Sequence, residues 1–308
     1  MTVNTNSRMT VKHLVSVGIV AIAAVSIIAC DPGIDENDLY LGQRPPGGTP
    51  VIFAPGIVST ENYEHSPAVF SPDLKTVYWT FEKQDPTQGI IKYSTYRDGA
   101  WTEPAATSFG ADFTNDTPYM TRDGRTMFFC SKRPMEGVEL GWHLWFATWE
   151  GSDWSAPKPL GLQETMPFSG YLTIADDGAV VFSGRGTEST DPRDIFTARF
   201  ENGRCSQPVR LPGVNSDFID GYPNISRDGT FLIFESDRPG GLGGLDLYIS
   251  LRDENGGWAE PRNLGEPLNS PADDRYGQLS PDGKYLFFGS DRAGNMDVYW
   301  VDADALEP

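Results

Sequence analysis

The sequence predicts an all-β fold: a β-propeller of five four-stranded blades. Three observations lead to this prediction. An Asp-containing turn between two apolar runs occurs five times, a Pro-containing element occurs four times, and the copy of that element missing at the C-terminus is present near the N-terminus. Repeats of about 50 residues are typical of propellers, in which each repeat forms one blade. Six blades are the alternative, if residues 31–66 contribute more than one strand.

The first repeated element places an aspartate in a turn, followed by alternating apolar residues. Its copies read SPDLKTVYWTF from 71, TRDGRTMFFCS from 121, ADDGAVVFSG from 175, SRDGTFLIFES from 226 and SPDGKYLFFGS from 280. In four of the five copies the turn is Asp-Gly, a pair that favours a tight connection between antiparallel strands. Each copy therefore predicts a strand, a turn and a second strand.

The second element is a short strand ending in proline. It reads WTEP at 101–104, WSAP at 154–157, CSQP at 205–208 and WAEP at 258–261, and a further apolar strand precedes each copy. The last repeat stops before this element, whereas Thr49-Pro50-Val51-Ile52-Phe53 supplies it in register. We therefore expect the N-terminal strand to complete the last blade, which closes the ring and leaves no unpaired sheet edge.

A hydrophobic segment precedes the repeats. Arg8, Lys12 and His13 form a basic start, and an uncharged run of 16 residues from Leu14 to Ala29 follows. This run is shorter than the roughly 20 residues of a membrane-spanning helix and suits a signal peptide. Its end, Ile-Ile-Ala-Cys, resembles the bacterial lipoprotein signal, which implies cleavage before Cys30 and lipid attachment to it. A transmembrane anchor and an ordinary secretory signal are the alternatives.

The chain is thus expected to have three parts. Residues 1–29 are the lipoprotein signal peptide, residues 30–48 a flexible acidic tether rich in Gly and Pro, and residues 49–308 the propeller domain. We expect a monomeric domain in the bacterial cell envelope. A lipid would hold it on the inner or the outer membrane, facing the periplasm.

The charge balance excludes one class of partner. The chain has 24 Lys and Arg against 43 Asp and Glu, a formal net charge of -19. Removal of residues 1–29 takes away only Arg8 and Lys12 among the counted charges, so the mature chain carries -21. Such a surface repels phosphate backbones, and we expect no nucleic-acid binding.

The repeats also carry a resemblance. The pattern S-P-D-G-K-x-L-x-F, then S-D-R-x-G, then D-x-Y, clear in SRDGTFLIFESDRPGGLGGLDLYIS from 226, resembles the WD-like repeat of TolB-type periplasmic propellers over roughly residues 50–302. The resemblance implies the fold. Similar blades occur in peptidoglycan-associated envelope proteins, some serine peptidases and oligogalacturonate lyases, so it implies no single function. The sequence shows neither the separate N-terminal domain expected of TolB nor a peptidase domain.

Charged residues that recur in several blades are interpreted as structural. Arginines follow the second strand, and aspartates open the third strand. We expect Arg238 to pair with Asp246, and Arg292 with Asp297, across their hairpins. Cys130 and Cys205 are expected to be buried or isolated, not joined in a disulfide.

Residues that differ between blades point to a site. The loops that enter the innermost strands carry carboxylates, and three blades have a tyrosine at matching positions. We expect a rim at one mouth of the central channel, formed by Glu64, His65, Asp116, Tyr171, Asp220, Tyr222, Asp274, Arg275 and Tyr276. Such a rim could bind a basic peptide, a sugar through tyrosine stacking, or a calcium ion. The alternative is a solvated acidic loop face with tyrosines packed between blades.

Enzyme signatures are absent from the sequence. It contains no H-E-x-x-H, G-x-S-x-G or P-loop motif, and the mature chain has only two histidines. No catalytic residue and no cofactor is predicted, apart from the calcium option. The leading hypothesis is a non-catalytic protein that binds or scaffolds a protein or peptide. A carbohydrate-binding or carbohydrate-active propeller, similar to a glycoside hydrolase or lyase, is the alternative.

Overall fold

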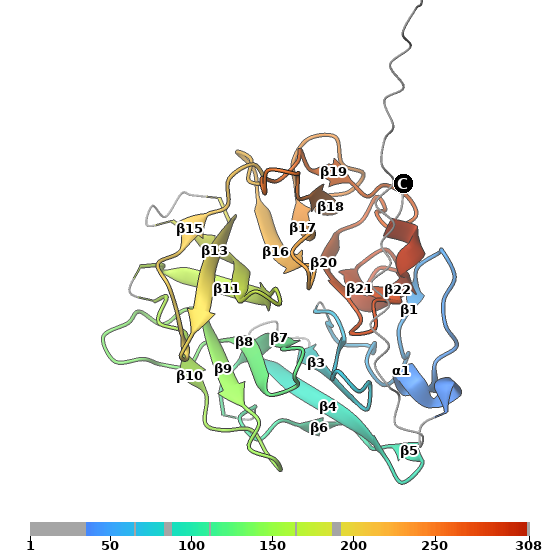
Figure 1. The fold of residues 1–308 in the computed structure, drawn as a ribbon. Helices are drawn as coiled ribbons and strands as arrows, with labels where there is room; N and C mark the ends of the chain where they lie inside the picture. The colour runs from blue at the N-terminus through green and yellow to red at the C-terminus, as the bar shows by residue number, and fades with distance from the viewer. Residues whose placement is uncertain are drawn as a thin grey trace, which may run out of the picture.

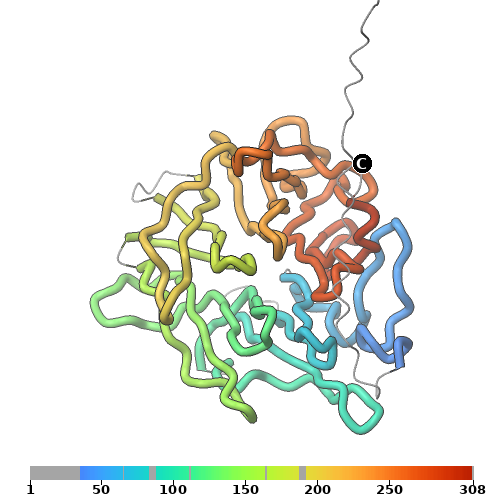
Figure 2. Tube along the Cα trace, in the orientation of Figure 1, coloured from blue at the N-terminus to red at the C-terminus, as the bar shows by residue number. Residues whose placement is uncertain are grey.

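Five antiparallel sheets surround a central axis, and the chain visits them in order (Figure 1). This computed structural model describes residues 35–64, 66–82, 88–110, 112–163, 165–186 and 192–306. Figure 2 shows the chain passing around the ring, so that the blue N-terminal part lies beside the red C-terminal part. The all-β prediction and the count of five blades are therefore confirmed, and the six-bladed alternative is wrong.

Each blade is described from its innermost to its outermost strand. Blade I contains β2 (Val69–Phe70), β3 (Thr76–Glu82), β4 (Gly89–Arg97) and β6 (Ala105–Ala106), with β5 (Ala100–Trp101) in a hairpin on β4. Blade II contains β7 (Asn115–Met120), β8 (Thr126–Ser131), β9 (His143–Thr148) and β10 (Lys158–Pro159). Blade III contains β11 (Phe168–Ile174), β12 (Ala179–Arg185), β13 (Asp194–Glu201) and β15 (Val209–Arg210), with β14 (Arg204–Cys205) in a hairpin on β13.

The last two blades repeat this order. Blade IV contains β16 (Asp220–Ile225), β17 (Phe231–Ser236), β18 (Asp246–Leu251) and β19 (Arg262–Asn263). Blade V contains β20 (Asp274–Leu279), β21 (Tyr285–Ser290), β22 (Asp297–Asp302) and the N-terminal strand β1 (Val51–Ile52). A short 3-10 helix, Ala303–Leu306, follows β22. Because β1 comes from the start of the chain, the two ends of the repeat array are joined in one sheet.

This closure is held by pairing and by packing. Val51 pairs with Trp300 and Ile52 with Tyr299. The amide of Phe53 then donates to the carbonyl oxygen of Val298 at 2.7 Å. The ring of Phe53 packs edge-on against Phe287 and Trp300, with centroids 5.0 and 5.2 Å apart. The sequence prediction that the N-terminal strand completes the last blade is confirmed.

The repeated aspartates form the turns between the first and second strands. In blade IV, Asp228 Oδ1 accepts from the Ser226 hydroxyl at 2.8 Å and from the Thr230 amide at 3.0 Å. Such bonds let Asp replace a missing backbone partner in a turn. Gly229 then takes a left-handed φ of 71°, which favours glycine. Leu74 holds this position in blade I with φ 60°, and its side chain is buried in the core.

The segment before the first strand packs on the ring. A 3-10 turn, Glu36–Asp38, precedes α1 (Leu39–Gly42), and all three of Leu39, Tyr40 and Leu41 are buried. These residues belong to the range that we expected to be a flexible tether, and the reason for the difference is the apolar triplet. The described residues contain no helix long and apolar enough to cross a membrane. Residues 1–29, expected to form a signal peptide, and Cys30 lie outside the described residues.

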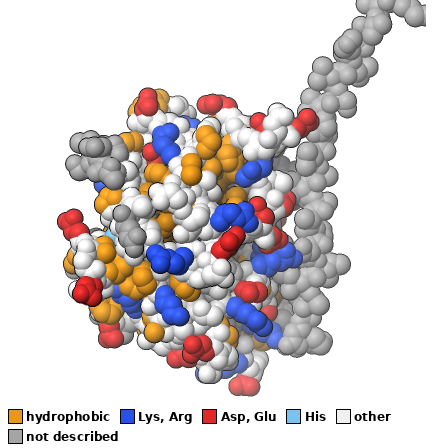
Figure 3. Space-filling model, turned by 60° about the vertical axis from the view of Figure 1, so that its left-hand side comes forward, with side chains coloured by type: hydrophobic (Ala, Val, Ile, Leu, Met, Phe, Trp, Pro, Cys, Tyr) orange, Lys and Arg blue, Asp and Glu red, His pale blue; other side chains and the backbone are white. Residues whose placement is uncertain are grey.

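One face of the surface mixes charges of both signs. Figure 3 shows one face of the molecule, on which the described basic and acidic side chains are interspersed and hydrophobic side chains form separate patches. A nucleic-acid-binding surface usually gathers its lysines and arginines into one patch or stripe. On this face the described basic side chains are not gathered in that way.

Loss of the ring closure is expected to be costly. Phe53→Ala removes a fully buried ring between the first and last blades, and we expect the free energy of unfolding to fall by about 3–5 kcal/mol. Val51→Ala is the matched control on the same strand, because the Val51 side chain is 44% exposed; it should cost less than about 1 kcal/mol. Urea titration measures both. Equal losses would show that the packing of Phe53 does not hold the ring shut.

Candidate functional site

The innermost strands share a distortion that directs side chains to the axis. In β7, β11, β16 and β20 the pairing with the next strand shifts by a residue. The residue at each shift has a left-handed φ of 43–58°; these residues are Thr117, Tyr171, Tyr222 and Tyr276. Such bulges re-aim a side chain at some cost in backbone energy. Their recurrence at one position in four blades indicates that the fold compensates for this cost.

The neighbouring blade supplies part of the compensation. The Thr117 amide donates to Thr80 Oγ1 of β3 at 3.0 Å, and the Tyr222 amide donates to Ser183 Oγ of β12 at 2.6 Å. The Tyr171 amide donates to the Cys130 sulfur of β8 at 3.1 Å. In three blades a small side chain of the second strand thus binds the bulge of the next blade.

The three tyrosines predicted at matching positions meet at the centre. Tyr171 lies 5.7 Å from Tyr222 and 6.1 Å from Tyr276 between ring centroids, and the last two are 4.0 Å apart. The Tyr171 hydroxyl donates to Gln278 Oε1 at 3.1 Å. Burial raises the pKa of each of the three phenols, so they remain neutral hydrogen-bond donors.

A buried charged cluster lies beside these rings. Glu235 of β17 forms ion pairs with Arg193 at 2.5 Å and with Arg275 at 3.2 Å. The Arg193 guanidinium lies over Tyr222 at 4.3 Å from the ring centroid, an arrangement that favours a cation. Burial has the largest single effect on the pKa of Arg275 and lowers it, but the Glu235 carboxylate and the phenols of Tyr276 and Tyr222 together raise it more, and the net shift is upward. Arg275 was predicted from the sequence, whereas Glu235 and Arg193 were missed.

The signal for Glu235 was present in the repeat. The other blades have Thr80, Cys130, Ser183 and Gly289 at this position of the second strand. A carboxylate within an otherwise apolar run, FLIFES, is a departure that only an ion-paired site makes favourable. Arg193 follows a loop between β12 and β13, and nothing in the repeat pattern distinguishes it.

A cavity of about 200 Å³ opens where the chain enters the innermost strands. We call it the channel-mouth cavity. Its lining contains five aromatic side chains and two carboxylates; the lining residues are Tyr63, Glu82, Asp116, Thr117, Cys130, Trp142, Phe168, Gly170, Tyr222 and Tyr276. Of the predicted rim, Asp116, Tyr222 and Tyr276 line this cavity. Glu82, Tyr63, Trp142 and Phe168 were not predicted.

The electrostatics of Tyr63 place several charges around the cavity. Burial raises the pKa of Tyr63, and the Arg275 guanidinium lowers it. The carboxylates of Glu82 and Asp116 raise it further. The phenol therefore interacts electrostatically with both acids and with Arg275 of the buried cluster. Its pKa is raised overall, which keeps Tyr63 protonated at neutral pH.

Three predicted carboxylates have a different role from the one expected. Glu64, Asp220 and Asp274 are fully buried. Each accepts a hydroxyl hydrogen bond from a residue four positions earlier, at 2.6, 2.8 and 2.8 Å. These bonds close the loop ahead of each inner strand. These three carboxylates therefore do not form the acidic rim. His65 lies outside the described residues.

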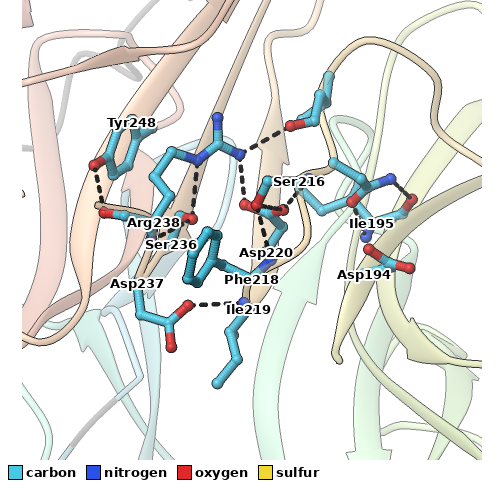
Figure 4. A network of polar contacts seen from close by, with 12 residues as sticks. Asp194, Ile195, Ser216, Phe218, Ile219, Asp220, Ser236, Asp237, Arg238 and Tyr248 are labelled. Carbon is cyan, nitrogen blue, oxygen red and sulfur yellow. Dashed lines mark hydrogen bonds and ion pairs between the residues drawn. The ribbon is translucent and has the colours of Figure 1, made fainter. Parts of the chain in front are cut away.

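Two of the recurring arginines bind two of these buried carboxylates. Arg238 pairs with Asp220 at 2.5 Å, as Figure 4 shows, and Arg292 pairs with Asp274 at 2.6 Å. The predicted pairs with Asp246 and Asp297 are wrong. Arginine reaches back to the start of the innermost strand of its own blade, while Asp246 accepts from the Leu242 amide at 2.5 Å in the adjacent loop. The structural interpretation of these residues holds, with different partners.

Two further expectations concern metals and cysteines. Within the part of the chain that the structure describes, no three His, Cys, Asp or Glu side chains lie close enough to hold a metal ion. The calcium option therefore finds no cluster of three carboxylates among these residues. Cys130 and Cys205 are free thiols, and burial raises the pKa of each to about 12. Both are unreactive at neutral pH, because the thiolate is the nucleophile.

Comparison with known proteins supports the fold. The chain matches no protein-family model and no curated protein sequence. A putative TolB from Agrobacterium tumefaciens superposes with a TM-score of 0.54 at 17% identity, over 79% of this chain and 78% of that one. An endo-arabinase from Bacteroides thetaiotaomicron gives 0.55 at 13% identity, over 80% and 96%, and a thermostable family-43 glycoside hydrolase gives 0.54 at 10%, over 84% and 90%. At such identities the similarity establishes the propeller fold alone.

The buried ion pairs predict a large stability effect. Asp220→Ala leaves the Arg238 guanidinium, whose side chain is 13% exposed, without its carboxylate, and we expect a loss of about 3–5 kcal/mol in the free energy of unfolding. Asp176→Ala breaks the exposed pair with Arg122 and should cost about 0–1 kcal/mol. Chemical denaturation distinguishes the two. Comparable small losses would contradict a structural role for Asp220.

Proposed function

We propose that this protein is a non-catalytic binding protein of the bacterial cell envelope that recognises a basic side chain of a partner protein or peptide. The observation that supports this proposal is the channel-mouth cavity, in which Glu82 and Asp116 stand among five aromatic side chains. Aromatic faces and carboxylates both attract a lysine or arginine.

The size and the charge of the cavity support a single basic group. Pockets for drug-sized ligands usually measure roughly 300–1,000 Å³, so a cavity of about 200 Å³ suits one side chain. The guanidinium of Arg275 is bonded to Glu235. The lining itself contains no lysine or arginine, although Lys132 and Arg185 lie over the rings of Trp142 and Phe168. Its two carboxylates, Glu82 and Asp116, favour a cation at the mouth.

We further propose that the chain is anchored through Cys30. The basic start, the uncharged run and the small residue before the cysteine support this proposal. The wild-type chain expressed in a bacterium should incorporate labelled fatty acid and remain with membranes after a salt wash. Cys30→Ser should abolish labelling and release the protein. Label in the Cys30→Ser variant would contradict lipid attachment at this residue.

A selection of random peptides tests the recognition proposal. The full chain in detergent should enrich peptides that contain Lys or Arg, and the double variant Glu82→Gln, Asp116→Asn should bind these peptides about tenfold more weakly or worse, because two charged contacts are lost. The matched control is Asp176→Asn with Asp177→Asn, which removes two exposed charges outside the cavity and should leave binding unchanged.

Any one of three results would contradict this proposal: enriched peptides that lack basic residues, equal binding by the two double variants, or an affinity that does not fall as salt is raised. The last follows because a partly open charged site is screened by ions.

A glycan is the second candidate ligand. The observation that favours it is the aromatic lining itself, since rings such as Trp142 and Tyr63 also stack on sugars. The fold similarity to an endo-arabinase adds weak support. Incubation with arabinan and with other neutral and acidic polysaccharides distinguishes the two. Binding or release of reducing ends that Glu82→Gln abolishes would favour the glycan over the basic peptide.

A further inference from the structure

The groove between blades V and I shows how this ring binds a peptide segment. Tyr40 inserts there, with its ring centroid 4.9 Å from both Phe70 and Tyr285 and 5.7 Å from Trp300. Its hydroxyl donates to Asp282 Oδ1 at 2.6 Å. The groove lies at the end of the inner strands that carries the Asp turns, opposite the channel-mouth cavity.

The hairpin of blade I holds the same segment from its other side. The Trp101 indole donates to the main-chain carbonyl of Asp38 at 2.7 Å, and the Tyr96 hydroxyl donates to the Asp38 carboxylate at 2.7 Å. Two residues, Asp38 and Tyr40, thus account for the hydrogen bonds that attach this segment to the groove.

The next groove, between blades I and II, has an equivalent lining but is hollow. It forms a cavity of about 640 Å³. The repeat places its residues one for one against those that surround Tyr40 and Asp38: Asp73 for Asp282, Thr76 for Tyr285, Tyr78 for Phe287, Tyr93 for Trp300, Met120 for Phe70, Trp149 for Tyr96 and Trp154 for Trp101. Smaller residues at three of these positions enlarge the hollow.

Asp73 has the same hydrogen bonds in its turn as Asp282, the acceptor of the Tyr40 hydroxyl. Asp73 Oδ1 accepts from Ser71 Oγ at 2.6 Å and from the Lys75 amide at 3.1 Å. The matching bonds of Asp282, from Ser280 and Lys284, measure 2.7 and 3.2 Å. Because the two turns are alike, Asp73 presents its carboxylate as Asp282 does to Tyr40.

Other grooves of the ring are filled from within the chain. Phe200 lies between blades II and III, 4.9 Å from Phe128 and 5.4 Å from Phe146. Between blades IV and V, Ala305 and Leu306 pack against the core cluster. In the I–II groove, Trp154 packs against Tyr78 with ring centroids 6.2 Å apart, while Trp149 is 39% exposed and a cavity remains between the blades. A cavity with aromatic side chains in its lining is typical of binding sites.

We propose that the groove between blades I and II binds a short segment of a partner protein in a turned conformation like that of residues 39–42, with a tyrosine inserted between aliphatic neighbours. Tyr78, Tyr93 and Met120 would contact the ring, and Asp73 would accept from its hydroxyl. Trp154 has the repeat position of Trp101, and its indole would turn from Tyr78 toward the carbonyl two residues before the tyrosine. This site is separate from the channel-mouth cavity and does not depend on the proposed function.

The charge of the groove selects the residue before the aliphatic–tyrosine pair. Asp73, Asp123 and Asp153 all line the hollow. A carboxylate at the position of Asp38 would therefore be repelled, while a neutral or basic residue is accepted. The same repulsion disfavours residues 35–43 of a second copy, which carry three acids.

The probe for this proposal is a fluorescent peptide derived from residues 35–43. Its sequence is Asn-Gln-Asn-Lys-Leu-Tyr-Leu-Gly-Gln, in which the three acids are replaced. Fluorescence anisotropy with the full chain in detergent should show saturable binding. Trp154→Ala or Asp73→Asn in the protein should weaken it about tenfold. Asp228→Asn, in the equivalent turn of blade IV, is the matched control and should leave the affinity unchanged.

The peptide itself supplies the second set of variants. Replacing its tyrosine by phenylalanine should weaken binding about fivefold through loss of the hydroxyl bond, and alanine should abolish binding. A photoreactive phenylalanine at this position should crosslink to Tyr78, Tyr93 or Met120. Thermal melting of each protein variant shows whether it is folded.

Any one of three outcomes would overturn the proposal. The first is that the peptide does not bind the folded wild-type chain, and the second is that crosslinks fall in the V–I groove or the channel-mouth cavity. The third is that the unmodified acidic peptide binds more tightly and the chain sediments as a dimer, which would make a second copy the occupant.

Discussion

Closure of the ring is the constraint on which the rest of the structure depends. A circular array of sheets has no free edge only if the last blade obtains its outer strand from the start of the chain. Here β1 pairs with β22 through only two residues, and aromatic packing adds what the short ladder lacks. Phe53 and Tyr40 fill the seam with rings from blades I and V. Once the seam is shut, the tyrosines of three blades are brought into contact at the axis.

The polar residues fall into two groups: those that recur in several blades and those that occur in only one blade. Carboxylates that recur at the start of the innermost strands, such as Asp220 and Asp274, are buried and bonded to arginines of their own blade. Residues that break the pattern lie at the axis instead. Glu235 replaces a small polar residue, and its two arginines cross from neighbouring blades. A propeller can thus keep its scaffold fivefold while its centre is made asymmetric by a few substitutions.

The repeat pattern predicted most of the architecture but less of the site. Spacing alone located the blades, the turns and the closing strand, because each depends on residues close in sequence. The meeting of Tyr171, Tyr222 and Tyr276 followed from their matching positions. The partners of Arg238 and Arg292 could not be predicted from the pattern, because the reach of these side chains depends on a bulge and a loop that the pattern does not show. Glu82 ends a regular strand, and only the ring geometry brings it beside Asp116.

The position of Tyr40 has a mechanical consequence. Tension on the chain from the N-terminal side would reach residues 38–40 before it reached β1. The hydrogen bonds from Trp101 and Tyr96, and the bond to Asp282, would bear that load first. They attach to both the first and the last blade, so a pull would be shared across the seam rather than peel its two-residue ladder open. The inserted tyrosine would therefore take part of the load off the sheet that closes the ring.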